Sequence, residues 1–379
     1  MSTTALGAPL LPTYARADVS FVSGEGSVLT DTDGKRYLDF VGGIAVVALG
    51  HGHPAPLAAA HAQLDKLWHV SNLYWTEPMA QLAALLSERF GGAQSFFCNS
   101  GAEAVEAAIK YARKATGKPG IVALESSFHG RTMGALAVTG QPAKRAAFEP
   151  LVPGVRFAQL NDTASLATAV DDDTGLILLE PVQGEGGVHP ASVHFLEKAR
   201  ELADAHGALL VFDEVQCGMG RTGSFFAWQR LGVKPDAVTL AKALANGLPI
   251  GALLVTDESA GGFEPGDHGS TFGGNPVAAA AACAVVEAMT DELLADVLRK
   301  GALLTARLER LPNVVEVRGT GLLLGIELDR TVKEIQTHAL ERGLVVCAAG
   351  ERVLRLTPPL TVTDDEIEQA LAILEEVFS

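Results

Sequence analysis

Apolar and polar positions alternate along the chain in blocks that predict strands and helices in turn. Short apolar runs bounded by turn residues predict buried strands, and they lie at 95–98, 121–125, 176–182, 208–212, 237–240 and 251–255. Apolar residues at helical spacing predict helices at 56–67, 79–90, 101–116 and 192–206. Near-continuous apolar strands are typical of a sheet covered on both faces. The pattern therefore predicts an α/β fold with a mostly parallel central sheet.

The two ends of the chain follow a different pattern. Residues 20–40 alternate strand and turn signals around Asp33-Gly34, which predicts a small antiparallel unit. After Ala284, helices are expected at 291–311, at 332–342 and from Asp364, and strands at 319–328 and 353–356. We therefore predict a large domain over 46–284 and a smaller α+β domain built from 1–45 and 285–379.

Composition narrows the class of partner. The chain has 379 residues, of which 48% are hydrophobic, so it is long enough for two domains. Its net charge of −16 opposes binding to nucleic acid and to anionic membranes. Four cysteines without C-x-x-C spacing argue against a metal site and for reduced thiols, and no targeting segment is evident. We expect small-molecule substrates and a cytoplasmic location.

The stretch from Ala237 to Gly251 contains the first candidate for chemistry. An apolar strand delivers Lys242 into a turn that contains Asn246, Gly247 and Pro249. An amine walled by small residues loses hydration and can lose its proton near neutral pH, as Schiff-base formation requires. The alternative for this residue taken alone is a solvated loop lysine.

A second candidate follows the strand at 95–98. The turn Asn99-Ser100-Gly101-Ala102-Glu103 opens a helix, and the first amides of a helix lack internal partners and attract anions. This arrangement suits a phosphate. An ordinary N-cap by Ser100 is the alternative at this point.

Polar residues also follow other predicted strands, and loops at one sheet edge converge on one pocket. The set around Lys242 suits pyridoxal phosphate. Asp213 would keep the pyridine nitrogen protonated, Phe128 would stack on the ring, and Gln216 would donate to the ring hydroxyl oxygen. Lys242, once free, would serve as the base that moves a proton.

The motifs that surround these residues occur together over nearly the whole chain. They are Phe97-Cys98-Asn99-Ser100-Gly101-Ala102-Glu103, Ser127-Phe128-His129-Gly130-Arg131-Thr132, Glu180-Pro181-Val182-Gln183-Gly184-Glu185-Gly186-Gly187, Asp213-Glu214-Val215-Gln216, Leu240-Ala241-Lys242 and His268-Gly269-Ser270-Thr271-Phe272-Gly273-Gly274-Asn275-Pro276. In these motifs the chain resembles the class-III, fold-type I pyridoxal-phosphate aminotransferases.

The resemblance implies a role for each site residue. Lys242, Asp213 and Glu185 would be catalytic. Cofactor contacts would come from Ser100, Gly101, Ala102, Phe128, Asp213, Val215, Gln216, Lys242 and Thr271. Substrate contacts would come from Arg131, Ser270, Arg355 and Glu185. Thr271 would complete the phosphate site of the partner subunit, which makes a homodimer with shared active sites necessary.

The resemblance also implies a reaction. We expect transfer of the δ-amino group of N-acetylornithine to 2-oxoglutarate, a step of arginine biosynthesis. Arg355 would hold a substrate carboxylate, and Glu185 would pair with Arg355 in one half-reaction and release it in the other. Related enzymes act on ornithine, succinylornithine, 4-aminobutyrate or a carrier-protein-bound lysine precursor. An aminomutase or racemase on the same cofactor and a non-catalytic scaffold are the alternatives of another class.

Overall fold

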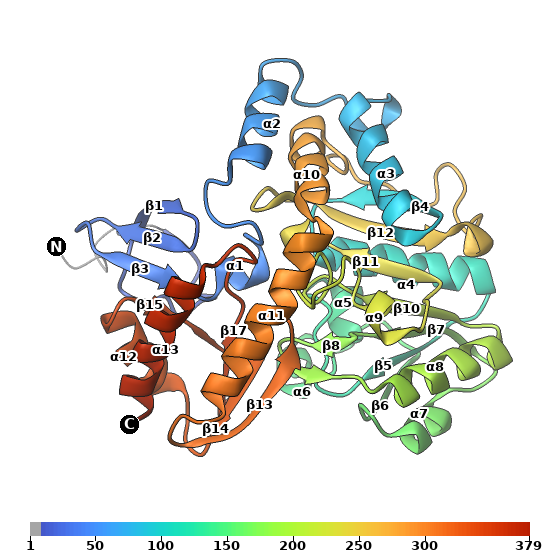
Figure 1. The fold of residues 1–379 in the computed structure, drawn as a ribbon. Coiled ribbons are helices and arrows are strands. Elements are labelled where there is room, and N and C mark those ends of the chain that lie inside the picture. Colours follow the sequence, from blue (N-terminus) through green and yellow to red (C-terminus); the bar gives the residue numbers. More distant parts are fainter. Residues whose placement is uncertain (1–8) are drawn as a thin grey trace.

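A computed structural model describes residues 9–379; residues 1–8, which begin the predicted small domain, lie outside the described residues. The centre is a seven-stranded sheet in the order β4-β12-β11-β10-β7-β5-β6 (Figure 1). Its strands are β4 Ala93–Cys98, β5 Gly120–Leu124, β6 Val155–Ala158, β7 Thr174–Leu179, β10 Leu209–Asp213, β11 Ala237–Leu240 and β12 Gly251–Thr256. The predicted α/β class is confirmed.

Six strands of this sheet run parallel, and β12 runs antiparallel to both of its neighbours, β11 and β4. The carboxyl ends of the parallel strands therefore share one edge with the amino end of β12, where Gly251 lies opposite Cys98. The edge strand β6 was not among the predicted strands. The sheet is mostly parallel, as predicted from its apolar runs.

Helices cover both faces of the central sheet. Along β10, Leu210 and Phe212 share an apolar cluster with helix α8 Val193–His206, whereas Val211 faces the cluster of helix α4 Gly101–Thr116. This alternation is the period-2 pattern of a strand buried on both sides. Each helix ends at a glycine in the left-handed region, Gly117 for α4 and Gly207 for α8.

The other helices and short strands between residues 42 and 288 surround the central sheet or connect its strands. They are α1 Gly42–Ala45, α2 Pro54–Leu64, η2 Ser71–Leu73, α3 Glu77–Phe90, α5 Met133–Ala137, α6 Pro142–Arg145, η3 Ala146–Phe148, α7 Thr163–Ala169, β8 Val182–Gln183, β9 His189–Pro190, α9 Trp228–Leu231, η4 Lys242–Ala245, η5 Asp257–Ser259 and α10 Pro276–Ala288. The alanine-rich α10 packs against α2 and α3. No helix in residues 9–379 combines the length and the apolar character needed to span a bilayer.

Two smaller sheets are built from the ends of the chain. One has the order β1-β2-β3-β15 and the other β13-β14-β17-β16. Their strands are β1 Phe21–Glu25, β2 Val28–Asp31, β3 Arg36–Asp39, β13 Val314–Thr320, β14 Leu323–Leu328, β15 Leu344–Val345, β16 Cys347–Ala348 and β17 Val353–Leu356. In Figure 1 the N-terminal strands lie beside the C-terminal helices α12 Lys333–Glu341 and α13 Asp364–Phe378.

The single strand predicted at 319–328 is wrong. The segment contains the end of β13, a turn, and β14, which pair antiparallel as a hairpin. Gly321 has φ +57, in the left-handed region that glycine adopts without strain, so the chain reverses there. The apolar run continued through the turn and therefore hid it.

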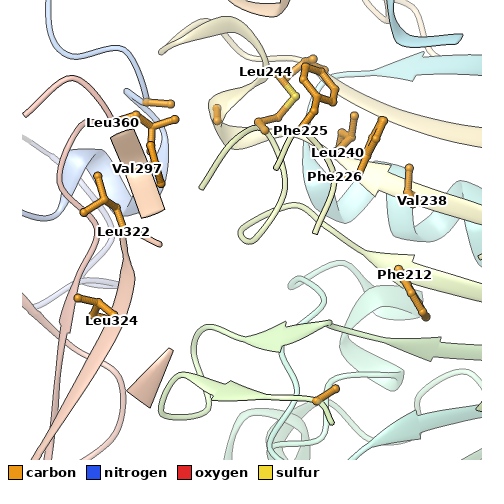
Figure 2. Close-up of a cluster of buried hydrophobic side chains, with 14 of the residues drawn as sticks. Phe212, Phe225, Phe226, Val238, Leu240, Leu244, Val297, Leu322, Leu324 and Leu360 are labelled. Atoms are coloured by element: carbon orange, nitrogen blue, oxygen red, sulfur yellow. The ribbon is translucent and has the colours of Figure 1, made fainter. Parts of the chain in front are cut away.

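One apolar core joins the central sheet to the C-terminal sheet. Figure 2 shows the cluster extending from Phe212, Val238 and Leu240 on the central strands to Leu322 and Leu324 at β14. Helix α11 Asp291–Leu308 lies between them and contributes Val297, which is fully buried. Because protein interiors are close-packed, this core fixes β17 relative to the central sheet.

We predict that Gly301→Ala destabilises the protein. A Cβ at Gly301 would overlap the Gly321 carbonyl oxygen where α11 crosses the hairpin turn. Helix propensity alone would favour alanine by about 1 kcal/mol, but overpacking costs about 1–3 kcal/mol. We expect a lower midpoint in urea unfolding followed by circular dichroism. Ala302→Ser, on the exposed side of the same helix, is the matched control, and a stabilised Gly301→Ala variant would contradict the packing.

Candidate active site

The loops that follow the parallel strands surround one cavity of about 420 Å³. The cavity lies where the carboxyl ends of the strands meet the start of β12. Its walls are formed by Val46, Asn99, Ser100, Gly101, Ala102, Phe128, His129, Gly130, Arg131, Glu180, Glu185, Asp213, Val215, Gln216, Ala241, Lys242, Gly247, Leu248, Pro249 and Ile250. The polar loops that follow β5, β7, β10 and β11 therefore meet at this cavity, as the sequence predicted.

Lys242 is the second residue after β11 and begins η4. Its φ is +40, a left-handed conformation that costs free energy for a non-glycine residue and is found mainly at functional sites. Asn246 secures the turn, because its side chain accepts a bond from Leu49 N at 2.8 Å and donates to Gly50 O at 2.9 Å. Burial lowers the pKa of Lys242, and Glu185 opposes that shift. The lysine therefore loses its proton more readily than a solvated lysine does.

Asp213 lies at the end of β10 and is held by three hydrogen bonds. Its Oδ1 accepts from Val215 N and from Thr239 Oγ1, each at 3.0 Å, and its Oδ2 lies 2.7 Å from His129 Nδ1. Burial alone would lower the pKa of His129, but the Asp213 carboxylate outweighs it and the pKa is raised. Within the described residues, His129 Nε2 is buried without a partner.

A second buried carboxyl group, Glu180, follows β7. Glu180 Oε1 accepts from Phe128 N at 2.9 Å, and Oε2 accepts from Gly184 N at 3.2 Å. Glu180 therefore ties the loop that contains the predicted stacking residue to the loop that contains Glu185. Burial raises the pKa of Glu180 to about 7, although the neighbouring His129 opposes the shift.

The start of α4 has backbone amides that could hold the predicted anion. Ser100 is the N-cap, and its hydroxyl accepts from Glu103 N at 3.2 Å. The amides of Gly101 and Ala102 have no intrahelical partner and no other partner among residues 9–379, so both remain for an anion. A Cβ at Gly101 would lie 2.9 Å from Val215 Cγ1, so only glycine leaves this wall open. Capping by Ser100 uses the amide of Glu103 and leaves those of Gly101 and Ala102 free, so the cap is compatible with the anion site, which stays a prediction.

Arg355, on β17, is fully buried behind Glu185. Its Nη1 donates to Glu185 Oε1 at 2.5 Å, to Gly184 O at 3.0 Å and to Gln216 Oε1 at 3.1 Å. Burial would raise the pKa of Glu185, but the guanidinium holds it below its usual range. The acid lines the cavity and the arginine does not, so a carboxylate reaches Arg355 only when Glu185 moves away.

Gln216 is hydrogen-bonded to both members of the Glu185–Arg355 pair. Its side chain donates to Glu185 Oε1 at 3.2 Å while its oxygen accepts from Arg355. Gln216 also lines the cavity. To reach a ring hydroxyl of the cofactor as predicted, its side-chain amide would have to turn away from Glu185. Its cofactor contact stays a prediction.

The other predicted residues lie in three places. Phe128 and Arg131 line the cavity, and the Arg131 guanidinium lies 5.6 Å from the centre of the Phe128 ring. Ser270 lies outside the cavity wall, but its hydroxyl accepts from Asn99 Nδ2, and Asn99 lines the cavity. Thr271 is exposed and is not part of the wall.

Sequence reasoning gave no role to His129, Thr239 or Glu180. His129 and Glu180 lie within two of the motifs described above, so their place in the sequence was the only signal for them. Their hydrogen-bond partners lie in segments that are distant in sequence. Thr239 is the one polar residue of the run at 237–240, which is a usable signal. Residues 9–379 contain no group of three or more His, Cys, Asp or Glu arranged to hold a metal ion.

Comparison with known proteins agrees with this geometry. The family aminotransferase class-III matches residues 13–378. The chain is 52% identical to an acetylornithine aminotransferase of Corynebacterium efficiens, over 98% of this chain and 95% of that one, and 51% identical to the Mycolicibacterium smegmatis protein of that name, over 98% and 96%. The crystal structure of N-acetylornithine aminotransferase from Stenotrophomonas maltophilia superposes with a TM-score of 0.84 at 39% identity, covering 96% of each chain. The Toxoplasma gondii ornithine aminotransferase gives 0.93 at 31% identity, over 98% of this chain and 92% of that one.

We predict that Glu180 makes stability depend on pH. A carboxyl group whose pKa rises from 4.5 unfolded to about 7 folded stabilises the fold most below about pH 4.5, and that contribution is lost as pH rises through about 7. The full change corresponds to about 3 kcal/mol. Urea unfolding at several pH values should show a smaller loss in Glu180→Gln than in the wild type, since the loss from Glu214, whose pKa burial raises to about 8, remains in both. Exposed Glu125→Gln is the control, and a pH-independent gap between Glu180→Gln and wild type would contradict the assignment.

Proposed function

Because this chain belongs to the class-III aminotransferases, which are pyridoxal-phosphate enzymes, we propose that it transfers the δ-amino group of N-acetylornithine to 2-oxoglutarate. The products would be N-acetylglutamate 5-semialdehyde and glutamate, in arginine biosynthesis. The observation that supports this most is the grouping of Lys242, Asp213 and the start of α4 around one cavity, with the Arg355–Glu185 pair at its edge.

The residues present fit the cofactor. The free amides of Gly101 and Ala102 would hold its phosphate, and the glycine at 101 leaves room that a Cβ would fill. Asp213 would pair with the ring nitrogen, Phe128 would cover one ring face, and Val215 would line the other side of the cup. When bound, pyridoxal phosphate supplies an imine-forming aldehyde and an electron-withdrawing ring.

Lys242 has two tasks in this proposal, and both use its uncharged form. Its Nζ attaches the cofactor and, once released, accepts a proton from the amino carbon of the substrate. Burial lowers its pKa, so a larger fraction is unprotonated than for a solvated lysine. The left-handed backbone at Lys242 aims the side chain from the end of β11 into the cavity.

The Glu185–Arg355 pair supports the use of two substrates that differ in charge. With Glu185 in place, the guanidinium is neutralised and screened, and N-acetylornithine would rely on Arg131, with Ser270 nearby. When 2-oxoglutarate enters, its carboxylate would replace Glu185 at Arg355 in a bidentate contact. Gln216 bonds to both partners and would guide this exchange.

We also propose a homodimer with shared active sites. Thr271 is exposed and outside its own cavity wall, which suits a role at the phosphate of the partner subunit. Several large apolar side chains are also exposed, which supports a covered surface; they include Trp68, Leu73, Tyr74, Trp75 and Phe272. The four free cysteines support a reducing location, the cytoplasm.

The proposed division into domains follows the same sheets. The central sheet lies within 46–284, and the two smaller sheets lie within 1–45 and 285–379. Pairing of β3 with β15 joins the two parts of the small domain. Arg355 belongs to the small domain and Glu185 to the large one, so the exchange at Arg355 would occur across the boundary.

An amino-donor panel with 2-oxoglutarate as acceptor tests the reaction. We expect the highest kcat/KM for N-acetylornithine, with lower values for ornithine, succinylornithine and 4-aminobutyrate. Lys242→Ala should remove both the turnover and the yellow absorbance of the cofactor-bound protein, because the attaching amine is absent. Preference for unacylated ornithine would overturn the substrate, and turnover without any oxo acid would indicate a mutase or racemase.

Subunit complementation tests the shared site. Lys242→Ala and Thr271→Asp should each be inactive, the second because a carboxylate repels the phosphate. Refolding an equal mixture should restore about a quarter of wild-type activity, since half of the dimers are hybrids with one intact site of two. The same mixture of Lys242→Ala with Asp213→Asn is the control and should recover no activity, because Lys242 and Asp213 come from the same subunit at each site and every site of the hybrid then lacks one of them. No recovery from the Thr271→Asp mixture, with dimers confirmed, would contradict a shared site.

A further inference from the structure

Two cations, Arg131 in the cavity wall and Lys144 beside it, lie close to the ring of Phe128. Lys144, on the short helix α6, lies with its Nζ 5.3 Å from the centre of the Phe128 ring, and the Arg131 guanidinium lies 5.6 Å from the same centre. Phe128 and Arg131 both line the cavity. Each of the two cations is attracted to the Phe128 ring by a cation–π interaction.

Neither cation has a carboxylate partner among the described residues. Arg131 makes no hydrogen bond or ion pair within residues 9–379, and the one bond of the Lys144 ammonium goes to the amide oxygen of Gln141. That amide is neutral, so it positions the ammonium without compensating its charge. Gln141 is itself fixed, because its Nε2 donates to the carbonyls of Ser126 at 3.2 Å and Ser127 at 3.3 Å.

Holding Lys144 and Arg131 near each other has an electrostatic free-energy cost. Burial lowers the pKa of Lys144, and the charge of Arg131 lowers it further, whereas Glu185 opposes the shift. Glu185 is already paired with Arg355. Two like charges held near each other, one of them partly buried, raise the free energy of the empty cavity. A bound anion would remove that cost and gain charge-assisted hydrogen bonds.

We propose that Lys144 is a specificity-determining residue that, with Arg131, binds the carboxylate of the substrate farthest from the reacting carbon. This inference rests on the proposed function and extends it, since N-acetylornithine and 2-oxoglutarate both carry such a carboxylate. Lys144 discriminates against amines without one. The Gln141 anchor holds the ammonium in place before the substrate arrives, so less side-chain entropy is lost on binding.

Steady-state kinetics of cofactor-bound variants test the proposal. Lys144→Met keeps the length and removes the charge, and it should raise KM for N-acetylornithine about tenfold to a hundredfold with kcat within about twofold, as expected for one charge-assisted bond. Lys144→Arg should restore most of the affinity. Putrescine, an amine donor without a carboxylate, should keep its kcat/KM in Lys144→Met. Exposed Lys333→Met, on α12, is the matched control.

The outcomes separate this inference from the proposed function. If the wild type does not use N-acetylornithine, the proposed reaction is wrong. The role of Lys144 is then tested by measuring the binding of glutarate, which Lys144→Met should weaken. An unchanged KM for N-acetylornithine, or an equal loss with putrescine, would overturn the inference. If Lys144→Met loses the cofactor but keeps an unchanged KM, the inference is also overturned. Lys144 would then contribute to cofactor binding.

Discussion

The negative charge of Asp213 at the base of the cavity is the constraint on which the rest of the site depends. A buried carboxylate is tolerated only when its oxygens are hydrogen-bonded, and here a backbone amide, a threonine hydroxyl and His129 supply those bonds. Three different parts of the chain must therefore meet at the end of β10. The raised pKa of His129 and the position proposed for the cofactor ring both follow from this one charge.

The opposite edge of the cavity is organised by an exchangeable ion pair. Arg355 is buried and would be costly without an acid, and Glu185 supplies that acid from another loop. The pair keeps the site charge-balanced when no dicarboxylate is bound. The cations near Phe128 are different, because no carboxylate among residues 9–379 forms an ion pair with either of them, and their unpaired charge favours an anion from solution.

Much of this could be predicted from the sequence, and the parts that could not share a cause. The buried strands, the start of α4 and the position of Lys242 follow from local apolar runs and turn residues. The direction of β12, the hairpin within 314–328 and the partners of Asp213 depend on contacts between distant segments. Gln216 shows the limit for a single residue: its motif predicted a place at the cavity, but its bonds are set by Arg355, on strand β17, and by Glu185, on another loop.

The pairing of β3 with β15 has a consequence for how the protein is made. The two strands are separated by about 300 residues, and β15 hydrogen-bonds to β3 in parallel register. A ribosome that adds about 5–20 residues per second needs roughly 15–60 s to travel between them. Throughout that interval the third strand of the nascent polypeptide presents an uncovered edge, which invites pairing with other chains. The shortness of the strand, four residues, limits that hazard until translation ends.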